Sequence, residues 1–239
     1  MKNIFARSGV EFLAVFLGIA LSLWVDEYQK TRESKRLSNQ ILNRLYKNLE
    51  ADSTDGLWNQ RAHNLVIDSG DFILDWCKTN DGLNDSIEIH LSRLAIATTL
   101  VNIEEEYNAL KSSGRMELLE DERLVTALHD YYSWVAYIKI IQTNIRNIVV
   151  DQYLPFMTNY SEYFGLIKGK NIYDNTYPAF ELHSVPPKKK ISHYASHLGT
   201  YGFYASGVYK TFMDKVTLLR KLIREKNRAS SDSDETIKN

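Results

Sequence analysis

The stretch EFLAVFLGIALSLWVDEY, Glu11 to Tyr28, decides how the rest of the chain is interpreted. Its unbroken apolar run from Phe12 to Val25 is short enough to be the core of a signal peptide or a buried helix. Counted from Ile4, however, the segment has about 22 residues, or roughly 33 Å of α-helix, which matches a bilayer core of about 30 Å. It ends in Leu-Trp-Val-Asp-Glu-Tyr instead of the small residues that suit cleavage. We therefore expect an uncleaved membrane anchor at residues 1–28.

Both ends of the predicted span carry residues that suit the edges of a bilayer. Arg7 and Glu11 are four residues apart, so they can pair on one helix face while Arg7 reaches the headgroups. Trp24 and Tyr28 are residue types that gather at the interface between membrane and water. A glutamate at the start of the apolar run is therefore compatible with a span.

One face of the same helix is built of small residues. Ala14, Gly18 and Ser22 repeat every four residues, and Glu11 lies one turn earlier on the same side. Small residues let two helix backbones approach closely in lipid, so this face is predicted to be the seam of a homo-oligomer or the polar lining of a pore. In the alternative interpretation, small residues are simply common in spans and Glu11 only pairs with Arg7 at the interface.

The composition is that of a folded protein without a nucleic-acid partner. The 239 residues are 44% hydrophobic and 25% charged, and the formal net charge of −1 gives no electrostatic reason to bind nucleic acid. Four prolines and eleven glycines are few for a chain of this length, which favours long helices. The single cysteine, Cys77, excludes an intrachain disulfide and fits a periplasm as well as a cytosol.

Three stretches resemble a family of uncharacterised single-span bacterial membrane proteins. They are GVEFLAVFLGIALSLWVDEYQKTRE at residues 9–33, LSNQILNRLYKNLEAD at 37–52, and EYNALKSSGRMELLEDERLVTALHDYY at 106–132. The family opens with a Glu-led anchor helix of Gly-Ile-x-x-Ala-Leu type and carries a Tyr-x-x-Leu-Lys-Ser-Ser-Gly block. This chain departs from it in having Leu-Trp-Val at 23–25 and a shorter basic N-terminal tail. The resemblance implies membrane anchoring and supplies no known activity.

A count of basic residues on the two sides of the span favours the opposite orientation from the one that we predict. Lys2 and Arg7 precede the span, whereas four basic residues follow it at 30–36. Translocating a very short tail with two basic side chains and the amine is nevertheless unfavourable. We therefore predict a single span in the bacterial inner membrane with the N-terminus inside and the C-terminal domain in the periplasm.

Beyond the anchor, apolar residues recur at helical spacing, which predicts an all-α fold. We expect the anchor helix to continue into an amphipathic stalk at 29–55, followed by a helical-bundle domain at 56–227. Four helices are expected in that domain, besides a short one between a capping box of Asn102 with Glu105 and a C-terminal stop at Gly114. The four cover residues 58–76, 86–97, 124 to about 155 with Gln142 in the seam, and 208–223. An irregular, aromatic-rich insertion is expected at 156–204 and a disordered tail at 228–239.

No group of residues forms a convincing catalytic or metal site. His193 and His197 in HYASH would share a helix face, with His183 or Glu181 as a third ligand, but Tyr194 stands where a zinc protease needs a glutamate. We therefore predict no metal and no cofactor. The other candidates have structural explanations: an acidic first helix turn for Glu104–Glu106, a glycine cap for Ser112–Arg115, and an unactivated thiol for Cys77. The segment VPPKKK at 185–190 is expected to be a solvated loop, or else a contact with anionic lipid.

The function predicted from these features is a non-enzymatic interaction or scaffold module at the bacterial envelope. It is anchored in the lipid bilayer, self-associates as a homo-oligomer, and engages an unidentified protein partner. The alternative is a membrane-bound sensor or pore-type effector. In that case the aromatic segment recognises a ligand through a pocket formed by residues such as Tyr160, Tyr163, Tyr177 and Tyr201.

Overall fold

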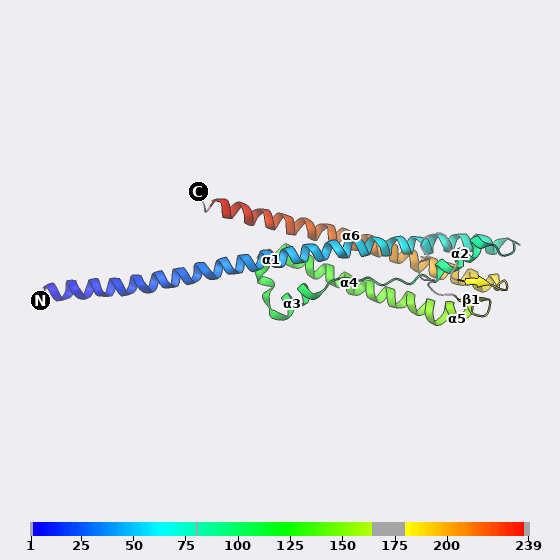
Figure 1. Ribbon diagram of the computed structural model, residues 1–239, viewed down its shortest axis with the longest axis horizontal. Helices are drawn as coiled ribbons and strands as arrows, with labels where there is room; N and C mark the ends of the chain where they lie inside the picture. Colours follow the sequence, from blue (N-terminus) through cyan, green and yellow to red (C-terminus); the bar gives the residue numbers. More distant parts are fainter. Residues whose placement is uncertain (1, 80, 164–179, 237–239) are drawn as a thin grey trace.

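The computed structural model describes residues 2–79, 81–163 and 180–236. The side chains of residues 2–11, 14, 163, 180 and 230–236 lie outside this description. In the described ranges the chain forms an all-α bundle with one small β-hairpin, so the predicted fold class is confirmed at that level. The helices α1 (Lys2–Lys78), α4 (Glu122–Ile148) and α6 (Lys188–Thr236) run side by side, and the N-terminal part of α1 projects far beyond the others (Figure 1).

The projecting helix α1 is continuous from the predicted anchor to the far end of the bundle. Its 77 residues correspond to a length of about 115 Å. The expected boundary between a stalk and a separate next helix is therefore absent. Gly56, which suggests a break in the sequence, has a packing role instead, because a Cβ atom there would lie 2.5 Å from Cε1 of Phe212 in α6. The glycine lets two helices approach and does not end one.

A folded-back connection follows α1. It consists of α2 (Asp85–Leu94), an extended segment at 95–104, α3 (Glu105–Ser113) and the 3₁₀ turn η1 (Arg115–Leu119). The predicted capping box is wrong, because the N-cap of α3 is Glu104 and the Asn102 side chain donates to that glutamate at 2.9 Å. The predicted stop at Gly114 is confirmed: its φ of 68° is left-handed, a conformation that glycine adopts without strain.

The helical run that begins with α4 ends close to the expected position near Pro155. It continues through a π-helical turn, η2 (Val149–Tyr153), into the short helix α5 (Leu154–Met157), where Pro155 lies in the first turn. Proline is tolerated there because its missing N–H has no intrahelical partner to lose. The predicted seam residue Gln142 is buried, and its side chain donates to the Tyr209 hydroxyl at 2.5 Å.

The irregular insertion is shorter than expected, and the C-terminal helix is much longer. The strands β1 (Ser161–Tyr163) and β2 (Phe180–Leu182) pair antiparallel, and residues 164–179 between them lie outside the described residues. The helix α6 begins at Lys188, so residues 188–204 are helical and not irregular. It also runs to Thr236, which makes most of the expected disordered tail a helical extension.

The lysine run after the two prolines begins α6 and has a structural role. Lys188 Nζ donates to the carbonyl oxygens of Trp76, Thr79 and Asp81 at 3.3, 2.8 and 3.1 Å. It also lies 4.4 Å from the centroid of the Trp76 ring. These bonds hold the start of α6 against the end of α1 and the turn that follows it. The expectation of a solvated or lipid-contacting loop is therefore wrong for Lys188.

The core lies along the seam where α1, α4 and α6 meet. Its side chains are aliphatic and aromatic, and burial of this apolar surface is the main force that holds the helices together. The largest fully buried side chains include Tyr131, Tyr153, Tyr209, Phe212, Leu42, Leu45 and Leu49. The buried tyrosines each direct a hydroxyl to a polar partner, so the core also contains polar groups that fix which residues meet.

Candidate functional site

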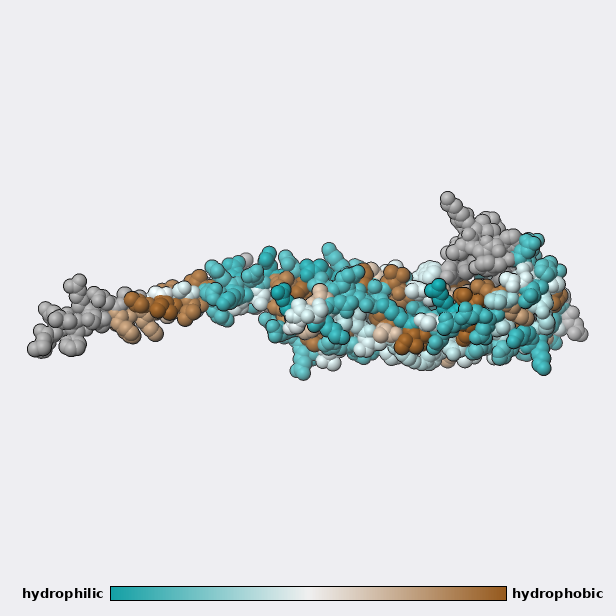
Figure 2. Space-filling model, turned by 90° about the horizontal axis from the view of Figure 1, so that it is seen from below, coloured by the Kyte–Doolittle hydropathy of each residue, from teal (hydrophilic) through white to brown (hydrophobic). Residues whose placement is uncertain are grey.

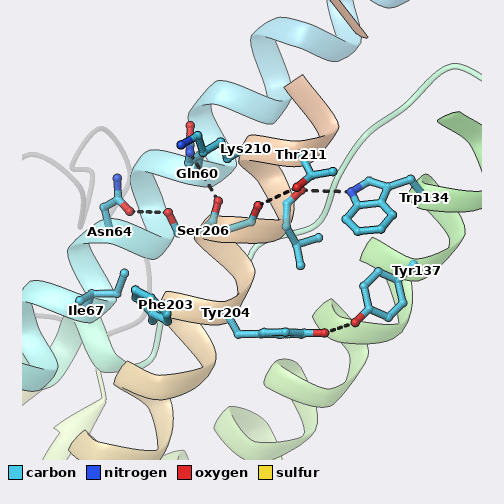
Figure 3. A pocket seen from close by; sticks show the side chains of 12 residues that line it. Gln60, Asn64, Ile67, Trp134, Tyr137, Phe203, Tyr204, Ser206, Lys210 and Thr211 are labelled. Atoms are coloured by element: carbon cyan, nitrogen blue, oxygen red, sulfur yellow. Dashed lines mark hydrogen bonds between the residues drawn. The ribbon is translucent and has the colours of Figure 1, made fainter. Parts of the chain in front are cut away.

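An open groove with a volume of about 650 Å³ lies between α1, α4 and α6. Its lining comes from all three helices, as Figure 3 shows. The lining residues are Gln60, Asn64, Ile67, Trp134, Tyr137, Phe203, Tyr204, Ser206, Gly207, Val208, Lys210 and Thr211. This volume lies within the range of small-molecule sites.

Aromatic side chains form one wall of this groove. Trp134 is fixed by a hydrogen bond from its indole N–H to the carbonyl of Val208 at 3.1 Å. The hydroxyls of Tyr137 and Tyr204 meet across the gap between α4 and α6 (Figure 3). Phe203 is 73% exposed, which is unusual for a large apolar side chain on a folded bundle. The wall therefore presents apolar faces to a ligand or a partner.

Amide and hydroxyl groups form the opposite wall. The Ser206 hydroxyl donates to Asn64 Oδ1 at 2.7 Å, and the Gln60 amide donates to the Ser206 carbonyl at 3.4 Å. Lys210 supplies the only charge among the described lining residues, which include no carboxylate, imidazole or thiol. The groove can thus bind by stacking, hydrogen bonding and a single positive charge, while the described lining offers no acid–base pair.

A buried polar cluster lies on the face of α1 that meets the extended segment 95–104. Asp52 is fully buried, and its carboxylate accepts from the Tyr131 hydroxyl at 2.6 Å and from the Ile103 N–H at 3.0 Å. Burial raises the pKa of Asp52 to about 6, although the two hydrogen bonds act to lower this pKa. Asp55 in the next turn accepts from the Val101 N–H at 2.8 Å. Two carboxylates of α1 therefore hold the extended segment by its backbone.

His63 completes this cluster one layer further along. Its Nε2 lies 3.2 Å from the Thr98 hydroxyl, and its ring stacks on Tyr209 with centroids 5.7 Å apart. Burial lowers the pKa of His63 to about 4, so the imidazole is neutral at pH 7. Asp52, Asp55 and His63 were not predicted from the sequence as site residues. The available signal was their recurrence on one face of a helix otherwise lined by apolar residues.

The two histidines considered as metal ligands lie one helical turn apart on α6. His193 and His197 lie on α6 with ring centroids 5.8 Å apart, and His197 packs against Tyr201. The backbone N–H of His183 bonds to the Tyr160 carbonyl at the hairpin. Within the described residues, no group of three or more His, Cys, Asp or Glu residues could hold a metal ion.

The remaining chemical candidates engage in structural contacts. Glu104 pairs with Lys139 of α4 and Glu106 with Arg44 of α1, both at 2.5 Å, so these carboxylates point to different helices. The Ser113 hydroxyl donates to the Ala109 carbonyl at 2.7 Å. Burial raises the pKa of the Cys77 thiol, which makes it a weaker nucleophile at neutral pH.

Two of the four tyrosines expected to form a ligand pocket have described side chains, and these two pack on different neighbours. Tyr160 packs on Phe156 at 5.2 Å between ring centroids, whereas Tyr201 packs on His197 in α6. Tyr177 and the side chain of Tyr163 lie outside the described residues. The groove uses Phe203 and Tyr204 from the end of that aromatic segment, together with aromatic residues of α4.

The predicted anchor carries a band of apolar side chains without a protein partner. Each described member is between 40% and 70% exposed, and Figure 2 shows the band on the projecting part of α1, beyond a hydrophilic stretch. The members are Phe12, Leu13, Val15, Phe16, Leu17, Ile19, Leu21, Leu23, Trp24 and Val25. We call this set the apolar band.

The flanking and small-residue positions of the anchor are described only in part. The rings of Trp24 and Tyr28 stack at 5.9 Å between centroids, and Gly18 and Ser22 are exposed. The side chains of the other three predicted positions, Arg7, Glu11 and Ala14, lie outside the described part. Taken over the described residues alone, no helix is both long enough and apolar enough to cross a membrane.

Comparisons with known proteins add no relative. No protein-family model, no curated protein and no solved structure matches this chain. The resemblance to single-span bacterial membrane proteins therefore stays a prediction.

Proposed function

We propose that this chain is a non-enzymatic, single-span protein of the bacterial inner membrane whose helical domain is a self-associating interaction module of the envelope. Its partners are the lipid bilayer, further copies of the chain and a protein yet to be identified. No nucleic acid and no cofactor take part. The anchor is the helix from about Ile4 to Val25, and the bundle lies on the periplasmic side.

The observation that supports this proposal best is the apolar band. A helix that is apolar on all sides is ordinarily buried in a large core or in a bilayer. In this chain such a segment projects away from the bundle, with large side chains exposed around the whole helix. Water is a poor environment for so large a contiguous apolar surface, whereas lipid is a favourable one. Trp24 and Tyr28 at its end suit the headgroup region.

Extraction of membranes tests the anchor. We expect the full-length protein to stay in the membrane fraction through an alkaline carbonate wash and to leave it when residues 1–25 are deleted. Replacing Phe16 and Ile19 with lysine in the full chain should also release it, since a charge at a helix centre costs about 2.5–3.5 kcal/mol on insertion scales. Phe203→Lys, a change at an exposed aromatic of the bundle, is the control and should stay bound.

Two results would contradict the anchor. One is extraction of the wild-type chain by carbonate, and the other is a mature protein whose first residue lies after residue 20. Reporter fusions after Asn239 decide the orientation independently of the anchor, because a periplasmic and a cytoplasmic reporter respond on opposite sides of the membrane.

A second candidate function is favoured by the groove between α1, α4 and α6. Its volume and its aromatic and amide walls suit a small ligand, which would make the bundle a membrane-bound sensor. The two functions differ in one observable. A sensor requires a ligand that raises the unfolding temperature and loses this effect when Gly207 at the groove is enlarged, whereas a scaffold requires neither.

A further inference from the structure

A group of cations gathers on the C-terminal third of α6. Arg220, Arg224 and Arg228 are four residues apart, so they share one helix face, and Lys221 stands beside them. We call these four residues the arginine cluster. Together with Thr217 and Glu225 they line a hollow of about 440 Å³. Arg224 and Arg228 are exposed, so a solute can reach them.

Two members of the arginine cluster converge on one neutral oxygen. The Nη2 atom of Arg220 donates to the Tyr46 hydroxyl of α1 at 3.0 Å, and Nη2 of Arg224 donates to the same hydroxyl. Both guanidinium groups also lie over the Tyr46 ring, with their central carbons 4.9 and 5.2 Å from its centroid. Tyr46 thus holds two like charges close together, and the pKa of its phenol is lowered by their hydrogen bonds.

Carboxylates only partly neutralise this cluster. Glu50 lies 3.5 Å from Arg220 and Glu225 lies 3.9 Å from Lys221. Within the side chains that the structure describes, no carboxylate pairs with Arg224 or Arg228. The Nε atom of Arg220 is also buried without a hydrogen-bond partner.

Cations elsewhere on the bundle are arranged differently. Lys215, Lys226 and Arg44 each meet a carboxylate on another element, namely Asp130, Glu120 and Glu106. The arginine cluster has one pair of this kind, Arg220 with Glu50, and otherwise meets the Tyr46 phenol between two helices. A phenol orients guanidinium groups by stacking without neutralising them, which leaves their charge available to an anion.

We propose that the arginine cluster and Tyr46 form a binding site for a phosphate group. Paired guanidinium groups fit phosphate because their parallel N–H donors match its oxygens, and each such bond is assisted by charge. The hollow has room for a phosphate carried on a small organic group. This site is separate from the groove, and it does not depend on the proposed scaffold function.

The phosphate has two possible sources, a soluble phosphate ester or the headgroup of an anionic lipid. Tyr46 lies 21 residues beyond Val25, or roughly 30 Å along a straight helix, so a headgroup reaches the cluster only if the bundle leans toward the bilayer. The same chemistry serves both sources, and the experiment separates them.

The test uses the full chain in phosphatidylcholine nanodiscs, with inorganic pyrophosphate as the probe at constant ionic strength. Calorimetric titration should detect saturable binding to the wild type. The double variant Arg224→Gln with Arg228→Gln should weaken it at least tenfold, because it removes two exposed charge-assisted donors and leaves the core intact. The matched control, Lys189→Gln with Lys190→Gln, removes two exposed cations at the other end of α6, outside the groove, and should bind as the wild type does.

The charge-conserving variant Arg224→Lys tests the geometry and should bind more weakly than the wild type, because lysine lacks the paired donors. Adding anionic phosphatidylglycerol to the discs identifies the source. Weaker pyrophosphate binding in the wild type would mean that headgroups compete for the site, whereas unchanged binding would point to a soluble ester. The proposal is overturned if the wild type does not bind pyrophosphate in phosphatidylcholine discs, or if both double variants bind equally well.

Discussion

At the scale of single residues, Asp52 and His63 place two ionisable groups in the interior of the bundle with their pKa values displaced in opposite directions. Burial raises the pKa of Asp52 to about 6 and lowers that of His63 to about 4. A group with a raised folded pKa stabilises the fold below its unfolded pKa, and this contribution is lost as the pH rises through the folded value. Asp52 therefore favours folding in acid.

His63 changes the stability of the fold with pH in the opposite direction. Because its pKa is depressed in the fold, its contribution is complete above the ordinary histidine pKa and is lost as the pH falls through about 4. Between about pH 4 and pH 6.5 the two residues oppose each other, and a shift of about two pKa units corresponds to about 3 kcal/mol. Their effects on the free energy of unfolding should therefore largely cancel in the wild type.

Removing one of these two groups should reveal the pH dependence that the other gives to the free energy of unfolding. On going from about pH 7 to about pH 4.5, we expect Asp52→Asn to lose about 2 kcal/mol more stability than the wild type, because only the His63 effect is left. His63→Gln should lose less stability than the wild type over the same range. Urea unfolding of the full chain at both pH values, in one detergent, measures these differences. Equal pH dependence in all three proteins would mean that these two residues do not titrate as their burial requires.

The sequence contains part of this arrangement. Asp52, Asp55, Asn59 and His63 are separated by three, four and four residues, which is the spacing of one helix face and predicts that they share a side of α1. The spacing does not say what covers that side. Their partners outside α1 are the Tyr131 hydroxyl of α4 and, in the extended segment 95–104, two backbone N–H groups and a threonine. Such partners depend on the path of the chain and not on local periodicity.

At the scale of elements, the closest approach of α1 and α6 is made by glycines. A Cβ atom on Gly70 would lie 3.0 Å from the Ala195 carbonyl oxygen and 3.2 Å from the Gly199 Cα atom. Both are backbone atoms of α6, so neither can rotate away as a flexible side chain would. The two helices can only accommodate a larger residue at this position by moving apart.

We predict that Gly70→Ala destabilises the protein by about 1–3 kcal/mol, the usual range for overpacking, although alanine favours a helix by about 1 kcal/mol over glycine. The control is Gly207→Ala on α6, where nothing lies within 4 Å of an added Cβ. That change should stabilise the fold by up to about 1 kcal/mol, because only helix propensity acts. Chemical unfolding of both variants measures whether each substitution lowers or raises the free energy of unfolding. A stabilised Gly70→Ala protein would mean that α1 and α6 do not pack this closely.

These glycines also explain which helices could be predicted. The helix α4 follows from the regular apolar spacing of residues 124–149, and the end of α3 follows from Gly114. The expected boundary between residues 55 and 56, where Gly56 lies, was wrong, and so was the irregular segment expected up to Tyr204, because α1 and α6 are helical there. A glycine in a sequence can end a helix or let two helices touch, and only its packing partner tells these apart.

At the scale of the whole molecule, α1 joins the predicted anchor to the bundle without an interruption. The sequence predicts that the helix of residues 12–25 runs on into the stalk, but it does not predict that the same helix continues beyond residue 55 to Lys78. The groove could not be predicted either, because its walls combine residues of three helices that are far apart in the chain. A contact between two anchors would be transmitted along a single helix and would bring two bundles side by side.

A change in the anchor that weakens self-association should therefore alter the oligomeric state of the full chain. Gly18 is exposed, and no atom lies within 4 Å of a Cβ built there, so enlarging it leaves the single chain unaltered. In lipid, association depends on close backbone approach. Gly18→Ile should weaken a seam of Ala14, Gly18 and Ser22 by about 1–2 kcal/mol, which is roughly a tenfold change in association.

Cross-linking in native membranes measures this effect, and Leu17→Ile is the control because it alters a neighbouring face without filling the small-residue stripe. We expect the ladder of oligomers to fade for Gly18→Ile and to persist for Leu17→Ile. Because α1 is continuous, loss of the anchor contact should also remove cross-links between bundles that depend on it. If the same ladder forms in the wild type and in both variants, the stripe is not the seam. Self-association must then arise beyond the anchor, from the exposed faces of α1, α4 or α6.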